Sequence, residues 1–267
     1  MNTQKDSWSE RHYKQFQEEL AKIHPQKEDL SITEIVEKIK ILEDYSIDKN
    51  RCFALFSQID FYFLYLSKNA GTISGYTPNE IHKKGLLSAF KAFYWKQLPL
   101  AIKVHQWGNR FRKTLGKQVH TAKMEAAYCG MKLRIKNGDW KIFFLKQKIL
   151  TTNKTGHPIL SFLEIEDITT LYKSDYVWAR ISGHTETETI NRAYFQDGKK
   201  KEYADLLSNR EMEILHLIIA KKDNITISET LGISKNTVER HRKNMIARLG
   251  VTDMTALIYI CRRCQLL

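Results

Sequence analysis

Cysteine and long apolar stretches are both scarce in this sequence. Its 267 residues include four cysteines, Cys52, Cys129, Cys261 and Cys264, which are too few for the dense disulfide framework of a small secreted domain. No apolar run approaches the ~18 residues that a membrane-spanning helix needs, and the first six residues lack the apolar core of a signal peptide. The sequence therefore predicts a cytoplasmic protein with no membrane partner.

Motifs of the common enzyme classes are absent as well. There is no nucleophile elbow, P-loop, HExxH sequence or dinucleotide-binding glycine motif. Cys261 and Cys264 have CxxC spacing, but no second cysteine or histidine pair accompanies them, so zinc or redox chemistry is not expected. His82, His105 and His120 could each ligate haem, but a lone histidine is far more often a surface or core residue. We therefore predict no enzymatic activity, no catalytic or metal-binding residues and no cofactor.

Positive charge exceeds negative charge by a wide margin. The formal net charge is +13, which favours a polyanionic partner. Ten Lys/Arg and six Asp/Glu lie between Ser208 and Leu267, so only +4 of the excess belongs to that segment. Charge alone therefore does not locate a nucleic-acid site. The length of 267 residues predicts two domains, each long enough for a core of its own.

Helix signals are densest near the C-terminal end of the chain. The residues that can cap or end its helices are Ser208 with Glu211, Gly232, Ser234, Gly250 and Thr252. A serine with a glutamate three residues later is a capping box, and glycine takes the left-handed conformation that ends many helices. Three residues separate a second helix that ends at Leu231 from a third that runs to about Arg248. This spacing is typical of a helix-turn-helix.

The third of these helices has two distinct faces. Val238, Met245 and Leu249 fall on one side and are expected to pack inward. The opposite side carries, at helical spacing, Asn236, Glu239, Arg240, Lys243 and Ala247. Five Lys/Arg against one Glu give this helix a net charge of +4, so its N-terminal half suits the major groove of DNA. The alternative is a solvated basic helix on an ordinary helical bundle. That alternative does not explain why the caps, the turn and the charge placement occur together.

These residues resemble the LuxR-type helix-turn-helix domain. The resemblance rests on residues 207–211, 214–215, 231–234, 237–238, His241, Asn244 and 248–249. It implies a four-helix domain that binds double-stranded DNA. The sequence departs from the family where Lys221 replaces a usual glycine, where Ser228 replaces a usual alanine, and where Glu239 replaces a common lysine.

Seven residues of the third helix are the candidate DNA contacts. They are Lys235, Asn236, Thr237, Glu239, Arg240, Arg242 and Lys243. The spacing and the resemblance both place Glu239, Arg240 and Lys243 against base edges. Lys235, Thr237 and Arg242 are expected mainly to position the helix on phosphates. A carboxylate can accept from cytosine N4. The alternative is that Glu239 pairs with Lys235 or Arg242 at helical spacing and reads nothing.

A homodimer is the expected form on DNA, because one short recognition helix reads few base pairs. In the family that the C-terminal residues resemble, the fourth helix often pairs two subunits. The candidate dimerisation residues are the apolar stripe of that helix, Met254, Leu257, Ile258 and Cys261.

The upstream half has strand and helix signals of another kind. Short aromatic runs at 53–56 and 61–66 have strand propensity, and Pro99 opens an expected helix to about Leu115. Residues 131–136 alternate at period two before a turn at 137–139, which predicts a hairpin. Further strands are expected at 158–168, 176–181 and 186–195. This order implies an antiparallel sheet with helices on one side.

Part of this half resembles a PAS sensory domain. The resemblance rests on Ser67 and on residues 75–81, 134–140 and 167–169. It implies a domain that senses a small-molecule or protein ligand. The aromatic density of 53–66, 90–107 and 140–145 predicts an aromatic pocket without a cofactor.

The predicted fold is α+β, a PAS-like antiparallel sheet domain followed by an all-α four-helix LuxR-type domain. The expected boundaries are an N-terminal helical segment at 1–50, the PAS-like domain at 51–182, a linker at 183–205 and the DNA-binding domain at 206–267. A capping box at 31–34 supports the N-terminal helix, which is expected to pack within the chain. The predicted function is a sequence-specific transcriptional regulator. The alternative is a signalling module whose PAS-like half docks a partner and whose DNA binding is secondary.

Overall fold

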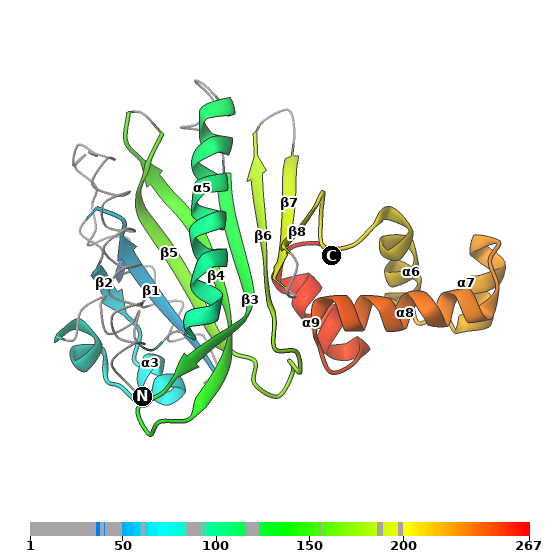
Figure 1. Cartoon of the computed structure of the whole chain (residues 1–267), viewed down its shortest axis with the longest axis horizontal. Coiled ribbons are helices and arrows are strands. Elements are labelled where there is room, and N and C mark those ends of the chain that lie inside the picture. The colour runs from blue at the N-terminus through cyan, green and yellow to red at the C-terminus, as the bar shows by residue number, and fades with distance from the viewer. Residues whose placement is uncertain are drawn as a thin grey trace.

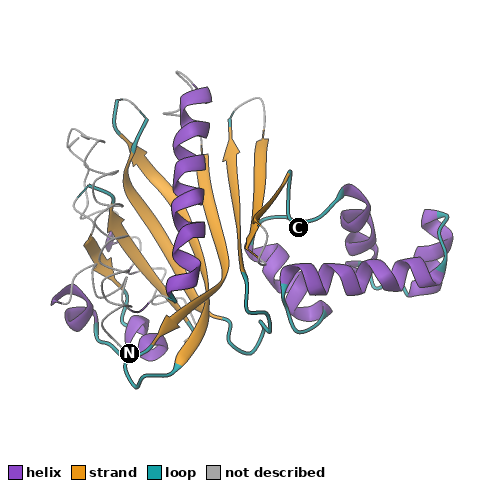
Figure 2. Cartoon of the chain, in the orientation of Figure 1, coloured by secondary structure: helices purple, strands orange, loops and turns teal. Residues whose placement is uncertain are grey.

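An eight-stranded antiparallel sheet and four C-terminal helices make up most of the chain (Figures 1 and 2). The computed structural model describes residues 36–37, 40, 50–59, 62–83, 92, 94–115, 123–154, 156–185, 189–196 and 200–267. The predicted N-terminal helical segment, with its capping box at 31–34, lies almost entirely outside these residues. Val36 packs against a small cluster that contains Phe53, Leu55, Ile159 and Leu160. None of the described helices is both long and apolar enough to cross a membrane.

The strands lie in the spatial order β2-β1-β5-β4-β3-β6-β7-β8. Their bounds are β1 (Arg51–Ser57), β2 (Tyr62–Leu66), β3 (Lys123–Arg134), β4 (Trp140–Thr152), β5 (Pro158–Asp167), β6 (Val177–His184), β7 (Thr189–Gln196) and β8 (Lys200–Tyr203). The predicted hairpin is confirmed, because β3 and β4 pair up to Arg134 opposite Trp140, with a tight turn between them. The strands predicted at 158–168, 176–181 and 186–195 correspond to β5, β6 and β7.

Two short helices and one long helix accompany the sheet. They are α3 (Asn69–Ser74), the 3-10 helix η1 (Trp95–Gln97) and α5 (Leu98–Leu115). The last of these matches the helix predicted from Pro99 to about Leu115. Leu100, Val104 and Trp107 of α5 pack in one core cluster with Ala179 and Tyr194 of the sheet. Figure 1 shows α5 running along one face of the sheet.

The segment predicted as a linker is largely part of the sheet. β7 pairs along β6, and β8 pairs along β7 from Ala193–Tyr203 to Gln196–Lys200. Ala193, Tyr194 and Phe195 are buried, so β7 contributes to the cores on both faces of the sheet. The lysine run that indicates a linker belongs in part to β8, which is an edge strand.

The four C-terminal helices begin and end near the predicted positions. They are α6 (Asn209–Ile219), α7 (Asn224–Leu231), α8 (Lys235–Leu249) and α9 (Met254–Arg263). The capping box of Ser208 is formed, and Ser234 accepts a hydrogen bond from the backbone N–H of Thr237. The prediction for the last helix was displaced by one residue, because Asp253 rather than Thr252 caps α9 and accepts from the N–H of Ala256.

Helices cover both faces of the sheet, contrary to the prediction of one covered face. Side chains of a strand alternate between its two faces. In β4, Phe143 lies in the cluster under α5, whereas the adjacent Phe144 lies in the cluster that contains the cores of α6 to α9. The C-terminal helices therefore share a continuous hydrophobic core with the sheet, on the face that α5 leaves open.

Candidate nucleic-acid interface

The predicted inner and outer faces of α8 are present in the structure. Val238, Met245 and Leu249 are buried in the core of the C-terminal helices. On the outer face, Asn236, Arg240, Lys243 and Ala247 are exposed, and Glu239 is half-exposed. Figure 1 shows α8 extending away from the sheet, with α7 near its N-terminal end. The N-terminal half of α8 is thus open to a partner.

The three candidate phosphate contacts, Lys235, Thr237 and Arg242, lie within the first eight residues of α8. Lys235 is exposed in the first turn. The hydroxyl of Thr237 lies 2.9 Å from that of Ser234, the residue that caps the helix. Arg242 donates from Nη1 to Oδ1 of Asn224 at 3.0 Å. Arg242 therefore links α8 to the first residue of α7 and keeps its guanidinium at the junction of the two helices.

Glu239 does not form the ion pair with Lys235 or Arg242 that is the alternative to base reading. Across the described part of the chain, its carboxylate pairs with neither Lys235 nor Arg242, and Arg242 bonds to Asn224 instead. The carboxylate is half-exposed on the outer face of α8. It is available to accept a hydrogen bond from a partner.

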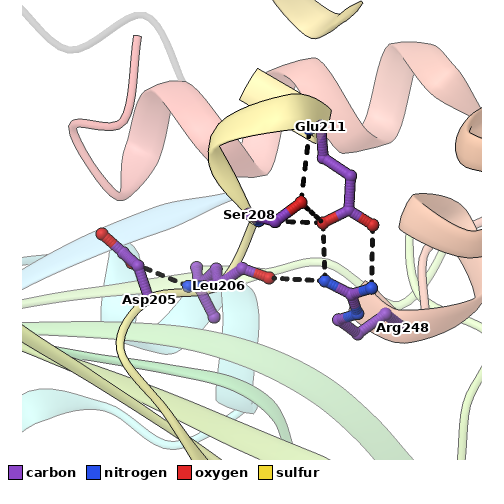
Figure 3. Close-up of polar contacts among 5 residues, drawn as sticks. All are labelled: Asp205, Leu206, Ser208, Glu211 and Arg248. Carbon is purple, nitrogen blue, oxygen red and sulfur yellow. Dashed lines mark hydrogen bonds and ion pairs between the residues drawn. The ribbon is translucent and has the colours of Figure 1, made fainter. Parts of the chain in front are cut away.

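An ion pair between the buried Glu211 and the partly exposed Arg248 holds α8 against α6 (Figure 3). Arg248 donates to both carboxylate oxygens of Glu211, from Nη1 at 2.7 Å and from Nη2 at 2.8 Å. The same carboxylate accepts from the backbone N–H and the hydroxyl of Ser208, each at 2.9 Å. Burial acts to raise the pKa of Glu211, but the hydrogen bonds from Ser208 and Arg248 outweigh it and hold the pKa below its ordinary value. The capping box thus also anchors α8.

Sequence reasoning counted Arg248 only as positive charge on the third helix. Its partner Glu211 was identified as half of a capping box. The two residues are 37 positions apart, so neither spacing nor composition joins them. The apolar neighbours of Glu211 in α6 gave the one available signal, since a carboxylate on a buried helix face needs a cation.

Lys221 occupies a backbone position that suits glycine. Its φ is 60°, in the left-handed region that is rare for residues with a Cβ. The sequence departs from the LuxR-type pattern at this very position, where the family usually has glycine. Lysine adopts this conformation in the turn between α6 and α7, where its N–H donates to the carbonyl of Ile218 at 2.9 Å.

The predicted dimerisation stripe is only partly accessible in this structure. Leu257 and Cys261 have no exposed area and lie in the core that α9 shares with the sheet. Met254 and Ile258 are half-buried and pack against that core. Sequence reasoning missed this, because the periodicity of a helix shows that one face is apolar but not what covers it.

Polar contacts fix the other side of α9 to β5. Arg263 donates from Nη2 to Glu164 at 2.5 Å and from Nε to Glu166 at 3.1 Å. The hydroxyl of Tyr259 donates to Glu166 as well.

Burial raises the pKa of Cys264, the residue that caps the C-terminal end of α9, to about 12. That thiol is therefore protonated at neutral pH and unreactive.

The aromatic residues predicted to line one pocket are divided among several clusters. Phe53 stacks on Phe162 in the small cluster beside β1. Trp107 of α5 packs edge-on against Tyr194, beneath α5. Trp140 is 47% exposed at the hairpin turn. Aromatic density in the sequence therefore does not define a single lining. Phe90 lies outside the described residues.

Comparison with known proteins identifies the C-terminal module. Residues 205–261 match the model of bacterial regulatory proteins of the luxR family. The transcriptional regulatory protein MctR of Rhizobium johnstonii is 41% identical over 81 residues, which is 27% of this chain and 38% of MctR. The transcriptional regulatory protein TdiR of Thauera aromatica is 38% identical over 71 residues, 26% of this chain and 31% of TdiR. The chain thus spans less than half the length of these relatives.

A solved structure of the Vibrio cholerae VqmA dimer aligns over 85% of this chain and 86% of its own, at 14% identity and a TM-score of 0.29. So loose a likeness supports no conclusion about arrangement, ligand or assembly.

The family match, the capped helices and the open basic face coincide in one segment. Residues 205–261 form a LuxR-type helix-turn-helix domain.

Proposed function

We propose that this chain is a sequence-specific DNA-binding transcriptional regulator whose α8 is the recognition helix. The observation that carries the proposal is the exposed face of α8, with Arg240 and Lys243 open and Glu239 beside them in a LuxR-type domain. Arginine and lysine donate to O6 and N7 of guanine in the major groove. The relatives that match this segment are transcription regulators, which supports the same role here.

The proposal assigns a PAS-like sensory role to the sheet. The segments on which the PAS resemblance rests lie close together at the hairpin end of the sheet. Lys136 donates its N–H to the carbonyl of Ser74 at 3.0 Å and its Nζ to Glu80 at 2.6 Å. Thr169 accepts from the N–H of Ile142 at 3.0 Å. The proximity of these segments supports a PAS-like fold at this end of the sheet. The proposed signal is a small-molecule or protein ligand.

The proposal includes a homodimer on DNA, because two recognition helices double the number of bases read. Selection of binding sites from random duplex DNA with the full chain tests both parts. We expect a palindromic motif whose half-sites are separated by about one helical turn. Recovery of sequences without a shared motif would contradict the proposed function, and a motif with a single half-site would contradict the dimer.

Substitutions on α8 separate base reading from phosphate contact. Glu239→Ala is expected to relax preference at one position of the motif, by about 1–3 kcal/mol of discrimination. Its general affinity stays level or rises, because a charge that phosphates repel is removed. Lys235→Ala is expected to weaken all sequences alike and to reduce the salt slope by about one. Selected motifs and salt titrations of the two variants measure these effects.

The two variants are controls for each other, since both remove the charge of one side chain on the same helix. If Glu239→Ala selects the wild-type motif at every position, the carboxylate reads no base. If Lys235→Ala changes the motif instead, the division between base and phosphate contacts is reversed.

A further inference from the structure

The C-terminal end of α8 is capped by side chains from the sheet. The last carbonyls of a helix have no partner within the helix and need an outside donor. The hydroxyl of Tyr176 lies 2.5 Å from the carbonyl oxygen of Ala247 and 2.6 Å from that of Arg248. The indole Nε1 of Trp178 donates to the carbonyl oxygen of Leu249 at 3.0 Å. The single hydroxyl proton of Tyr176 serves one of its two carbonyls at a time, so Tyr176 and Trp178 together supply two donors to the last turn of α8 from outside the helix-turn-helix domain.

Backbone pairing extends this connection into the turn after α8. The N–H of Lys173 donates to the carbonyl of Gly250 at 2.8 Å, and the N–H of Thr252 donates to that of Leu171 at 3.0 Å. Tyr172 between them is buried, and its hydroxyl donates to the carbonyl of Tyr176 at 2.7 Å. The segment before β6 is therefore fixed both to the helix end and to itself.

Both faces of β6 carry packed helices. Trp178 has no exposed area and lies in the core shared with α8 and α9. Its neighbours Val177 and Ala179 point to the opposite face, where they pack in one cluster with Val104 and Trp107 of α5. Side chains of a strand alternate between its faces, so one strand carries both the residues beneath α5 and a donor to α8. A displacement of β6 beneath α5 therefore moves the donors that hold α8.

We propose that Tyr176 and Trp178 are positioning residues of the DNA-binding site, and that β6 couples the α5 face of the sheet to the recognition helix. The inference rests on the proposed function of α8 and adds the element that regulates it. A ligand or partner that acts on the α5 face changes DNA recognition by shifting β6, without contact to α8. Neither residue belongs to the helix-turn-helix domain, so that domain alone lacks part of the support for its recognition helix.

Removal of the two donor groups in the full chain tests the inference. The double variant Tyr176→Phe, Trp178→Phe keeps an aromatic ring at each position and removes the hydroxyl and the indole N–H. It also removes part of the buried ring at 178, so the melting temperature of the variant is measured as well. The matched control, Tyr203→Phe with Trp140→Phe, makes the same changes at positions that are 42% and 47% exposed. Affinity for the selected motif and for unrelated duplex DNA is measured by fluorescence anisotropy. Hydrogen exchange is measured at the amides of 250–252.

We expect the double variant to lose affinity for the motif by roughly tenfold, the scale of one or two lost hydrogen bonds. Affinity for unrelated DNA and the salt slope stay unchanged, because no phosphate contact is removed. The amides of 250–252 exchange faster, and the control behaves as the wild-type chain. A merely structural role predicts an equal loss of affinity for both DNAs, together with a lower melting temperature.

The inference is overturned if the double variant keeps the wild-type ratio of specific to unrelated affinity. It is also overturned if that ratio stays constant while both affinities fall. Failure of the proposed function looks different, because the wild-type chain itself then shows no preference for any sequence, and the inference falls with it.

Discussion

Glu211→Ala is expected to destabilise the C-terminal domain by about 3 kcal/mol, the lower end of the range for breaking a buried ion pair. The carboxylate is 3% exposed and holds the side chain of Arg248, which is 34% exposed and keeps some contact with water. The substitution leaves that guanidinium without its bidentate partner. It also removes the carboxylate that accepts from the backbone N–H of Ser208 in the capping box. Urea unfolding of the full chain, followed at several wavelengths, measures the loss.

Glu213→Ala is the matched control on the same helix. Glu213 is 53% exposed and pairs with Arg210 at i,i+3, and exposed pairs of this kind contribute about 0–1 kcal/mol. Equal losses for the two variants would contradict the anchoring role of Glu211.

The pH dependence of stability provides a second readout of the same carboxylate. Its pKa in the folded chain is held below the ordinary value, while a glutamate carboxyl in the unfolded chain titrates at about 4.3. A group with a lowered folded pKa stabilises the fold above the unfolded pKa and loses that contribution as pH falls through the folded pKa. We expect wild-type stability to decline below about pH 5, and Glu211→Gln to show a shallower decline. Parallel pH profiles would contradict this assignment.

Gly250→Ala is expected to cost far more than Gly232→Ala, although both glycines end helices in the left-handed conformation. Their φ values are 70° and 64°, so the conformational cost of a Cβ, about 1–2 kcal/mol, is shared. A Cβ at 250 would lie 2.7 Å from Oγ of Ser174 and 2.8 Å from Cζ of Tyr172, whereas one at 232 meets nothing within 4 Å. The ring of Tyr172 is buried and cannot retreat freely.

The contact with Tyr172 adds about 1–3 kcal/mol for Gly250→Ala, as overpacking in a core does. Thermal melts of the two variants isolate the contribution of the interface between sheet and helices, because the shared backbone cost cancels. Equal melting temperatures would show that the helix end is not pressed against the sheet.

Local signals predicted the C-terminal domain well. Ser208, Ser234, Gly232 and Gly250 each act on backbone groups within a few residues, so their types and spacing determine where helices begin and end. The displacement of the last cap from Thr252 to Asp253 is a choice between two adjacent residues that can both accept from the helix start.

Contacts between distant residues were not predictable in the same way. Trp178 and Leu249 are 71 positions apart, and nothing near either residue indicates the other. The hydrophobic periodicity of α9 predicted an apolar face correctly, but Leu257 is covered by the chain itself. The prediction of a linker at β8 is wrong, because lysines such as Lys200 and Lys201 are typical both of linkers and of sheet edges.

The most direct test of α8 as the DNA-reading element compares two exposed arginines of one domain. Arg240 lies on the outer face of α8, and Arg262 lies in the last turn of α9. Both substitutions to alanine remove one positive charge, so they change the overall attraction to DNA equally. Competition binding of each full-length variant to the selected motif and to unrelated duplex is the measurement. We expect Arg240→Ala to lose about 1–3 kcal/mol on the motif and to relax one base preference, and Arg262→Ala to keep both. Equal losses for the two variants, with the base preferences intact, would contradict recognition by α8.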